Sequence, residues 1–384
     1  MGFLTRPIAL SFVLALVAFP TYTMSAAELQ PAGADLAYAD EIRTIVEGGI
    51  EAGEMPGAVV VVAGPQEVHY AMAFGNRRIQ PQVDPMTLDT IFDLASLTKP
   101  IATATSVMKL VQAGKVDVAA PVCDYLPEFS GQGKESITVS DLLLHVGGLI
   151  PDNALSDYDD GAEQAWQRIC KLKPIAPPGE KFAYTDVGFI VLGKLVEKIS
   201  GRSLDAYARD SIFRPCGMEE TTFNPDGDLR SRAAPTEKRD GAWMQGEVHD
   251  PRAYRLAGVA GHAGLFSTAG DLVKYGQMML AHGRANHAVV LNADVVAEMT
   301  RPRSIPRGTR TYGWDHHTGY SRNRGESLTD AAFGHGGFTG TVMWIDPEKE
   351  IVFIFLSNRL HPDGKGTVNG LAGQIATVVG NAEH

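Results

Sequence analysis

Hydrophobic residues near the start of the chain change from helical spacing to strand spacing. Residues 36–54 carry apolar side chains at helical intervals: Ile42, Ile45, Val46 and Ile50. Two apolar runs follow, a Val-rich one at 58–63 and another at 68–74, and Gly64-Pro65 between them is typical of a hairpin turn. We therefore expect a helix followed by two antiparallel strands.

The end of the chain has the same kinds of pattern in the opposite order. Residues 340–345 and 351–356 have the character of strands, and Asp346-Pro347-Glu348-Lys349-Glu350 between them is typical of a hairpin. An amphipathic helix is predicted for residues 368–379. The chain is therefore expected to end with two strands and a helix.

The middle of the chain, residues 96–215, has mostly helical spacing, which Pro and Gly clusters interrupt. Its clearest helix covers residues 186–200, and Gly201 closes that helix. The pattern favours the α/β class. We expect one α/β sheet domain assembled from residues 28–95 and 216–384, with residues 96–215 inserted as a helical domain.

Residues 1–27 have the three-part organisation of a secretory signal peptide. Arg6 precedes an apolar run at 7–20, and the small residues Ser25-Ala26-Ala27 are typical of a cleavage site. Cleavage after Ala27 would leave a periplasmic or secreted protein without a membrane span. The apolar run is short for a membrane span, and an uncleaved N-terminal membrane anchor is the alternative interpretation.

The composition is acidic and otherwise that of an ordinary globular protein. The formal net charge is −11 and no polybasic run is present, so we expect neither nucleic acid nor an anionic membrane as a partner. An exported protein can form disulfides, but Cys123, Cys170 and Cys216 allow at most one. The spacing of the three cysteines matches no metal site, so we expect no bound metal.

The strongest chemical signal is the segment Ser96-Leu97-Thr98-Lys99, just before a long apolar run. A Ser and a Lys three positions apart at the start of a helix lie on one face. A partly desolvated lysine can take the proton of a serine hydroxyl, and a helix N-terminus favours an oxyanion. A second match, Ser106-Val107-Met108-Lys109, lies inside the predicted helix, where the backbone N–H groups are already used, so we interpret it as structural.

Two further segments carry residues with suitable chemistry. Tyr184-Thr185-Asp186 lies at a turn that leads into the helix at 186–200, and a Tyr close to a Lys can take part in proton transfer. His335-Gly336-Gly337 opens the last strand pair, where glycines allow a ligand to approach the backbone of an edge strand. By itself, this second segment is equally typical of a glycine-rich turn with a surface histidine.

In this order, the three segments resemble the signature of the serine β-lactamase and penicillin-binding-protein superfamily, in its class C β-lactamase-like branch. That branch carries Ser-x-x-Lys, Tyr-x-Asn and Lys-Thr-Gly, a variant of the class A set. Supporting similarity lies in four segments: 138–149, 178–201, 258–268 and 334–347. The resemblance implies a β-lactamase-like fold, with an antiparallel sheet flanked by N- and C-terminal helices and an inserted, mostly helical domain.

The resemblance also implies roles for individual residues. Ser96 resembles the acylated nucleophile, Lys99 its proton acceptor and Tyr184 a second proton-transfer group. The backbone N–H groups of Ser96 and Phe338 would form the oxyanion hole. These roles together describe an acyl-enzyme mechanism without a cofactor.

Two motif positions and one segment after the last strand depart from the pattern of this branch. Asp186 replaces the usual Asn and brings a negative charge close to Lys99. His335 stands where the Lys of the third motif usually stands, and Gly337 matches its Gly. Asn358-Arg359 does not reproduce the Asn and Arg with which class C β-lactamases bind the antibiotic's carboxylate. These departures count against an efficient β-lactamase.

We therefore expect an exported serine hydrolase whose substrates are small molecules or cell-wall peptides. Peptidoglycan-derived peptides are the first expectation, as for a D,D-carboxypeptidase-like or muropeptide-cleaving enzyme. The alternatives are a carboxylesterase of the β-lactamase-like type, a weak β-lactamase, and a penicillin-binding sensor that is acylated without turnover. His249 and His262 could line the site or be structural.

Overall fold

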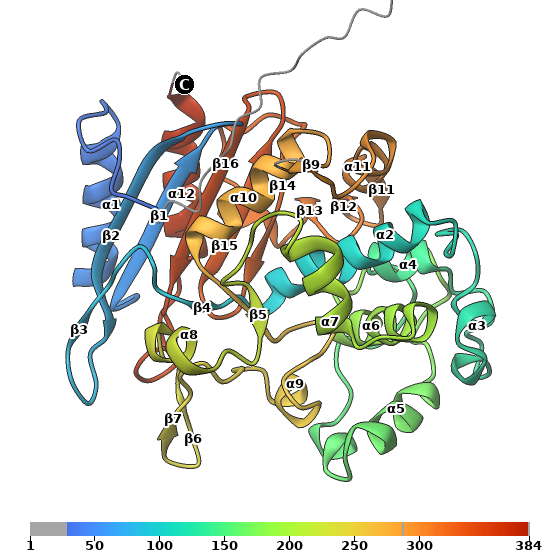
Figure 1. The fold of residues 1–384 in the computed structure, drawn as a ribbon. Helices are drawn as coiled ribbons and strands as arrows, with labels where there is room; N and C mark the ends of the chain where they lie inside the picture. The colour runs from blue at the N-terminus through green and yellow to red at the C-terminus, as the bar shows by residue number, and fades with distance from the viewer. Residues whose placement is uncertain (1–28, 286–287, 383–384) are drawn as a thin grey trace, which may run out of the picture.

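A nine-stranded antiparallel sheet runs through the structure and has helices packed against both of its faces (Figure 1). The computed structural model describes residues 29–285 and 288–382. The signal peptide predicted for residues 1–27 therefore lies outside the described residues. Within the described ranges, no helix combines the length and the apolar character that a membrane crossing requires.

The two ends of the chain meet in the middle of this sheet. The strands follow the order β11-β12-β13-β14-β15-β16-β1-β2-β3, and β1 pairs with β16 so that Val61 lies opposite Ile354. The bounds of the nine strands are as follows: β1 Gly57–Ala63, β2 Val68–Arg78, β3 Asp84–Pro85, β11 Arg303–Ile305, β12 Gly308–Arg310, β13 Asp315–His317, β14 Phe333–Gly337, β15 Thr341–Asp346 and β16 Ile351–Ser357.

Strand β1 is buried along its whole length because a core lies on each side of the sheet. Successive side chains of a strand point to opposite faces. Val59 and Val61 accordingly pack into the larger core, and Val60 and Val62 pack into the smaller one. The run of consecutive valines in this strand is explained by this burial on two sides.

The smaller core lies between the sheet and two helices, α1 (Ala39–Glu51) and α12 (Asn369–Asn381). Helix α10 (Ala269–Leu280) covers the opposite face and contacts β16 and β1. A Cβ atom at Gly276 of α10 would lie 2.5 Å from a methyl carbon of Val352, so the glycine allows this helix to pack closely against β16. Helices from both chain ends and the middle therefore sandwich the sheet.

The remaining elements mostly lie in the helical region beside the sheet, and α6 (Asp186–Ser200) is the longest helix among them (Figure 1). Their bounds are as follows: β4 Phe92–Asp93, η1 Ala95–Leu97, η2 Lys99–Ala104, α2 Thr105–Gln112, α3 Val122–Tyr125, η3 Pro127–Phe129, α4 Val139–Leu143, η4 Leu155–Tyr158, α5 Ala162–Cys170, α6 Asp186–Ser200, α7 Leu204–Ala208, η5 Arg209–Phe213, β5 Thr222–Phe223, α8 Gly227–Arg232, β6 Lys238–Arg239, β7 Ala242–Trp243, α9 Pro251–Arg255, β8 Leu265–Ser267, β9 Arg284–Ala285, β10 Ala288–Val289, α11 Ala293–Thr300 and η6 Ser321–Asn323.

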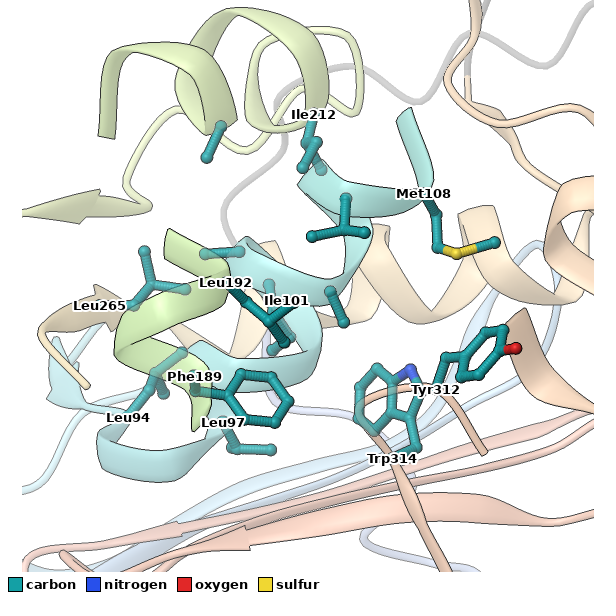
Figure 2. Close-up of a cluster of buried hydrophobic side chains, with 14 of the residues drawn as sticks. Leu94, Leu97, Ile101, Met108, Phe189, Leu192, Ile212, Leu265, Tyr312 and Trp314 are labelled. Atoms are coloured by element: carbon teal, nitrogen blue, oxygen red, sulfur yellow. The ribbon is translucent and has the colours of Figure 1, made fainter. Parts of the chain in front are cut away.

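The segment that carries the first motif is packed in the larger core, between α6 and the sheet. Figure 2 shows Leu97 and Ile101 from this segment together with Phe189 and Leu192 from α6. Trp314, just before β13, lies in the same cluster and is completely buried. The apolar positions after Ser96 therefore fix the orientation of the motif relative to the sheet.

The prediction of one continuous helix for this segment is wrong. The structure has a 3₁₀ turn η1, a π-helical turn η2 and the α-helix α2 in succession. Pro100 lacks the backbone N–H that a regular helix needs, and its carbonyl accepts a hydrogen bond from Thr105 Oγ1 at 2.8 Å. Single π-turns are frequent at functional sites, and this one begins at Lys99.

The other element predictions are largely confirmed. The helix predicted at 186–200 has these bounds, and Gly201 ends it in the left-handed region at φ +69°. Both predicted hairpins are present as β1–β2 and β15–β16. The small sheet β4-β8-β5 was not predicted, because its strands have only two or three residues. The three cysteines are free thiols: Cys123, Cys170 and Cys216.

Candidate active site

Ser96 lies on a tight turn at the end of strand β4. The preceding Ala95 has φ +46°, a left-handed conformation that is unfavourable for a residue with a side chain. The buried carboxylate of Asp93 supports this turn, because it accepts the N–H of Ala95 at 2.9 Å and the N–H of His249 at 2.7 Å. Strained backbone of this kind is often found where a reactive side chain is presented.

Lys99 is completely buried, and polar groups surround its ammonium group. Its Nζ donates to Ser96 Oγ at 3.1 Å and to the carbonyl of His262 at 3.0 Å, and lies 2.7 Å from Asp186 Oδ1. Burial by itself would lower the pKa of Lys99, but the charge of Asp186 and the phenol of Tyr184 outweigh it and raise that pKa well above the ordinary lysine value. Lys99 is therefore held as a cation.

Asp186 reaches Lys99 because another residue caps the helix that it begins. Thr185 is the N-cap of α6, and its side chain accepts the N–H of Gly188 at 3.2 Å. The Asp186 carboxylate, one residue further on, is left to pair with Lys99. The sequence-based expectation of a negative charge beside Lys99 is thereby confirmed.

The phenol of Tyr184 lies in a stack of aromatic rings above Lys99. Its ring is 4.4 Å from the ring of His145, and Lys99 Nζ is 4.9 Å from its centroid. The ring of Tyr320 lies 5.1 Å from the ring of Tyr184. Burial raises the pKa of Tyr184, and hydrogen bonds from Lys99 and Ser96 only partly oppose that effect. The phenol is therefore protonated at neutral pH.

His335 lies next to this phenol on strand β14. Its Nε2 is 3.5 Å from Tyr184 Oη, and its Nδ1 is 2.7 Å from the carbonyl of Gly336. Because a carbonyl only accepts, Nδ1 carries the proton and Nε2 is left with a lone pair. Burial, together with the positive charges of Arg310 and Lys99, lowers the pKa of His335 well below the ordinary histidine value. The imidazole is therefore neutral.

A cavity of about 370 Å³ brings the predicted residues together. Ser96, Tyr184, His335, Gly337 and Phe338 all line it. Phe338 lies at its rim and is 62% exposed. The predicted oxyanion-hole pair, Ser96 and Phe338, therefore borders one cavity.

Neither Lys99 nor Asp186 lines this cavity. Lys99 contacts Ser96 Oγ, which does line it, and Asp186 lines an adjoining cavity of about 470 Å³ that shares Tyr184 and Tyr320 with the first. A larger groove of about 1140 Å³ lies between α1 and α12, and none of the motif residues lines it. The chemistry is therefore concentrated around Tyr184.

Several lining residues were not identified as site residues from the sequence: Asp315, Tyr320, Asn323, Arg359, Thr367 and Asn369. Most of them lie in segments without hydrophobic periodicity, so no sequence pattern marks them. Asn369 is an exception, because a polar residue at the beginning of the last predicted helix was visible in the sequence. Arg359 brings the positive charge that His335 lacks, and its guanidinium lies 4.7 Å from the ring of Phe338.

His249 and His262 have separate structural partners. His262 Nε2 pairs with Asp250 at 2.8 Å, and its backbone carbonyl holds Lys99. His249 pairs with Glu237 at 2.6 Å and stacks on Phe338 at 5.6 Å. His249 therefore supports the rim of the cavity, and His262 supports its floor.

Three side chains below Lys99 come as close together as metal ligands do. Asp186, Asp250 and His262 each place one ligand atom within 4.8 Å of the others. Asp186 already pairs with the Lys99 ammonium, and Asp250 already accepts from His262. The Lys99 ammonium is therefore the cation that pairs with the Asp186 carboxylate.

The chain is similar in sequence to known proteins of one family. A family model described as Beta-lactamase matches residues 42–377. A Bacillus subtilis (strain 168) protein named N-acetylmuramyl-L-alanine amidase is 33% identical over 358 residues, which cover 84% of this chain and 81% of the relative. An Escherichia coli (strain K12) protein named "Putative D-alanyl-D-alanine carboxypeptidase" is 30% identical over 391 residues, which cover 92% of this chain and 89% of the relative.

The fold is also similar to that of solved structures. The crystal structure of a family VIII carboxylesterase superposes with a TM-score of 0.71 at 20% sequence identity, and the match covers 92% of this chain and 99% of that one. At this level of identity the similarity concerns the fold. The arrangement of sheet and helices expected from the three motifs is thereby confirmed.

Proposed function

The chain belongs to the beta-lactamase family of serine hydrolases, and we propose that it cleaves peptidoglycan-derived peptides through an acyl-enzyme on Ser96. The observation that carries this proposal is the contact between Ser96 Oγ and the buried Lys99 ammonium at 3.1 Å, at the floor of a cavity. The names of the two curated relatives, an amidase and a carboxypeptidase of cell-wall peptides, supply the substrate class.

In this mechanism Ser96 attacks the carbonyl carbon of the substrate's scissile amide. The N–H groups of Ser96 and Phe338 would stabilise the oxyanion, in the way that preorganised donors do in acyl transfer. The Lys99 cation lies close to the serine oxygen and favours the negative charge that develops there. Tyr184 would exchange protons with the serine, the leaving group and the deacylating water.

The edge of the sheet beside Ser96 suits an extended peptide. Strand β13 pairs with β14 only at Asp315 and Gly334, so no strand among the described residues pairs with His335 to Gly337 on that side. Backbone groups of a free edge can pair with a peptide in the manner of an added strand. Thr339 and Thr341 fasten this strand pair to the turn before Ser96 by donating to the carbonyls of Asp93 and Leu94.

Cell-wall substrates would require the protein to work outside the cytoplasm. We therefore propose that it is periplasmic or secreted after removal of residues 1–27. N-terminal sequencing of the exported protein should begin near Glu28. Recovery of the full-length chain in the membrane fraction would instead identify an N-terminal anchor.

A carboxylesterase is the second candidate function, and the neutral His335 favours it. Without a fixed charge on this residue, the cavity can accept an uncharged acyl group as well as a peptide. The fold similarity to a carboxylesterase is compatible with this alternative. A weak β-lactamase and a penicillin-binding sensor remain the other outcomes to be tested.

One side-by-side experiment separates these functions. Purified protein is given a muramyl peptide, a D-Ala-D-Ala peptide, a short-chain nitrophenyl ester and nitrocefin, and turnover is measured for each. The proposal expects the highest kcat/KM on a peptide. Higher values on the ester would identify a carboxylesterase, and higher values on nitrocefin a β-lactamase. Stoichiometric acylation by penicillin without turnover of any substrate would identify a sensor.

A further inference from the structure

The Lys99 ammonium is a hydrogen-bond donor without a lone pair. It donates to Ser96 Oγ and to the carbonyl of His262, lies 2.7 Å from Asp186 Oδ1 and hydrogen-bonds to the Tyr184 phenol. A group that donates a hydrogen bond to the serine oxygen cannot take the serine's proton at the same time. The proton that leaves Ser96 must therefore go to another group.

Tyr184 is the next polar group, but it can accept a proton only by releasing its own. It hydrogen-bonds to Ser96 and Lys99 and is a neutral phenol in this environment. A neutral phenol can pass a proton on, because its oxygen receives one hydrogen while its own O–H hydrogen leaves. This transfer needs an acceptor on the far side of the phenol.

His335 provides that acceptor. The hydrogen bond from Nδ1 to the Gly336 carbonyl fixes the tautomer, so the Nε2 lone pair is free and lies 3.5 Å from Tyr184 Oη. Catalytic hydrogen bonds are often this long before a substrate is bound. His145 cannot serve in the same way, because its Nδ1 already accepts the N–H of Thr185 at 3.0 Å and its Nε2 then carries the proton.

We propose that His335 is the final proton acceptor for Ser96, reached through the phenol of Tyr184, and that Lys99 acts only as a fixed cation. The proposal deepens the function given above and rests on its acyl-enzyme step. His335 does not contact the reacting atoms, so it acts through Tyr184. His335 would take the role of proton acceptor in place of Lys99, because the ion pair with Asp186 keeps Lys99 charged.

The proton balance of the acylation step is simple. The Ser96 hydroxyl proton moves to Tyr184 Oη, and the Tyr184 proton moves to His335 Nε2. The serine oxygen forms a bond to the carbonyl carbon, and the carbonyl electron pair becomes the oxyanion. When the oxyanion collapses, the bond to the leaving nitrogen or oxygen breaks, and the proton returns from His335 through Tyr184 to that atom. In deacylation the oxygen of water forms a bond to the acyl carbon, and its proton passes through Tyr184 to His335. The bond from that carbon to Ser96 Oγ then breaks, and the proton returns through Tyr184 to Ser96.

The charged and titratable groups around His335 set the pH range in which it can act. Arg310 of β12, Lys99 of η2 and Asp186 of α6 surround it, and Tyr184 and His145 pack beside it. The two cations and burial lower the pKa of His335, and Asp186 opposes them. His335 Nε2 should therefore become protonated only at a pH below the ordinary histidine pKa of about 6.5.

The test measures the rate at which a fluorophosphonate probe labels Ser96 between pH 4 and 9. The variants are His335→Gln and His335→Ala, and the control is His317→Gln, a half-exposed histidine outside the cavity. Wild type and control should label at the same rate, with an acid limb below the ordinary histidine pKa. His335→Gln should label about 10²-fold more slowly and lack that limb. Added imidazole should restore labelling of His335→Ala in proportion to its free base.

Several outcomes would overturn the proposal. Labelling of His335→Gln within threefold of wild type, with the same acid limb, would show that another group takes the proton. If His335→Ala is folded and imidazole has no effect, the relay is also wrong. Should both variants unfold, ¹⁵N NMR of the wild-type protein decides the matter. An Nε2 that already carries a proton at pH 7 would contradict the proposal, and one that titrates with the acid limb would support it.

The probe also separates this inference from the choice of substrate. Labelling needs only a reactive Ser96, whatever compound the enzyme hydrolyses. If no peptide is cleaved while labelling depends on His335, the proposed substrate is wrong and the relay stands. If peptides are cleaved while the labelling rate does not depend on His335, the relay is wrong and the proposed function stands.

Discussion

Asp186 Oδ1 lies 2.7 Å from Lys99 Nζ, and this contact determines the charge of the active-site lysine. The carboxylate stands where the related branch has an Asn, so it adds a full negative charge beside a buried ammonium. Lys99 had been expected to accept the proton of Ser96. In the relay proposed above Lys99 does not take this proton, because the ammonium has no lone pair and donates to the serine oxygen.

Ser96→Ala should abolish turnover and covalent labelling by fluorophosphonate or penicillin, because Ser96 Oγ is the serine hydroxyl that contacts Lys99 at the cavity floor. Ser106→Ala is the matched control. Ser106 is completely buried in α2 and its hydroxyl has no hydrogen-bond partner among the described residues, so its loss should leave activity and stability unchanged. Labelling that survives in Ser96→Ala would assign the nucleophile elsewhere.

Tyr184→Phe should lower kcat by about 10²-fold or more, the usual scale for loss of a general acid–base group. The ring would keep its stacking on His145 at 4.4 Å, so the melting temperature should change little. Steady-state kinetics and thermal unfolding of the same preparation check both expectations. An unchanged kcat at every pH would show that Tyr184 does not transfer protons.

Asp186→Asn should lower the pKa of Lys99, because the Asp186 carboxylate is the main group that raises it against burial. Lys99 would then lose its charge at a lower pH, and the alkaline limb of the kcat/KM profile should move toward acid. A pH–rate profile of the two enzymes measures this shift. Identical alkaline limbs would mean that the Lys99 charge does not matter for catalysis.

The same variant tests stability. A raised pKa in the folded state stabilises the fold below the ordinary lysine value, and this contribution is lost as the pH rises through the raised value. Near pH 7 the wild type therefore has the full contribution, and Asp186→Asn should be less stable by on the order of 3 kcal/mol. Urea unfolding should show this gap at pH 7 and a narrower gap at strongly alkaline pH.

Arg310→Met should raise the pKa of His335, because the Arg310 cation is the largest charge that lowers it after burial. If His335 accepts the proton, the acid limb of labelling should then move to higher pH. Arg310→Lys keeps the charge and should leave the limb in place. Because Arg310 pairs with the buried Asp315, thermal unfolding of both variants must accompany the kinetics. An acid limb at the same pH in Arg310→Met and Arg310→Lys would contradict the assignment to His335.

Gly261→Ala should destabilise the protein by about 3 kcal/mol and reduce activity. Its Cβ would lie 1.9 Å from the carbonyl oxygen of Phe189, so the loop would have to move and carry the neighbouring His262 carbonyl away from Lys99. Gly48→Ala is the control, because its Cβ meets nothing within 4 Å on helix α1. That control should be more stable by about 0.5–1 kcal/mol. Chemical unfolding of both variants measures the difference.

The sequence alone was sufficient for the fold class, the hairpins, helix α6 and the three motifs. These features are local, or depend on residue types at fixed spacing, so they can be predicted without knowing which segments meet. Ser96, Tyr184 and His335 were correctly grouped because their order along the chain resembles a known signature. Their convergence on one cavity is then a consequence of the fold.

Only the tertiary structure decided the charge states in the site. Whether Asp186 caps its helix or pairs with Lys99 depends on the position of Thr185, which takes the capping role. The neutral His335 depends on burial and on Arg310, which precedes it by 25 positions and comes from a different strand. Protonation depends on distance and on the loss of solvent, and both are set by segments that are far apart in the chain and meet only when it folds.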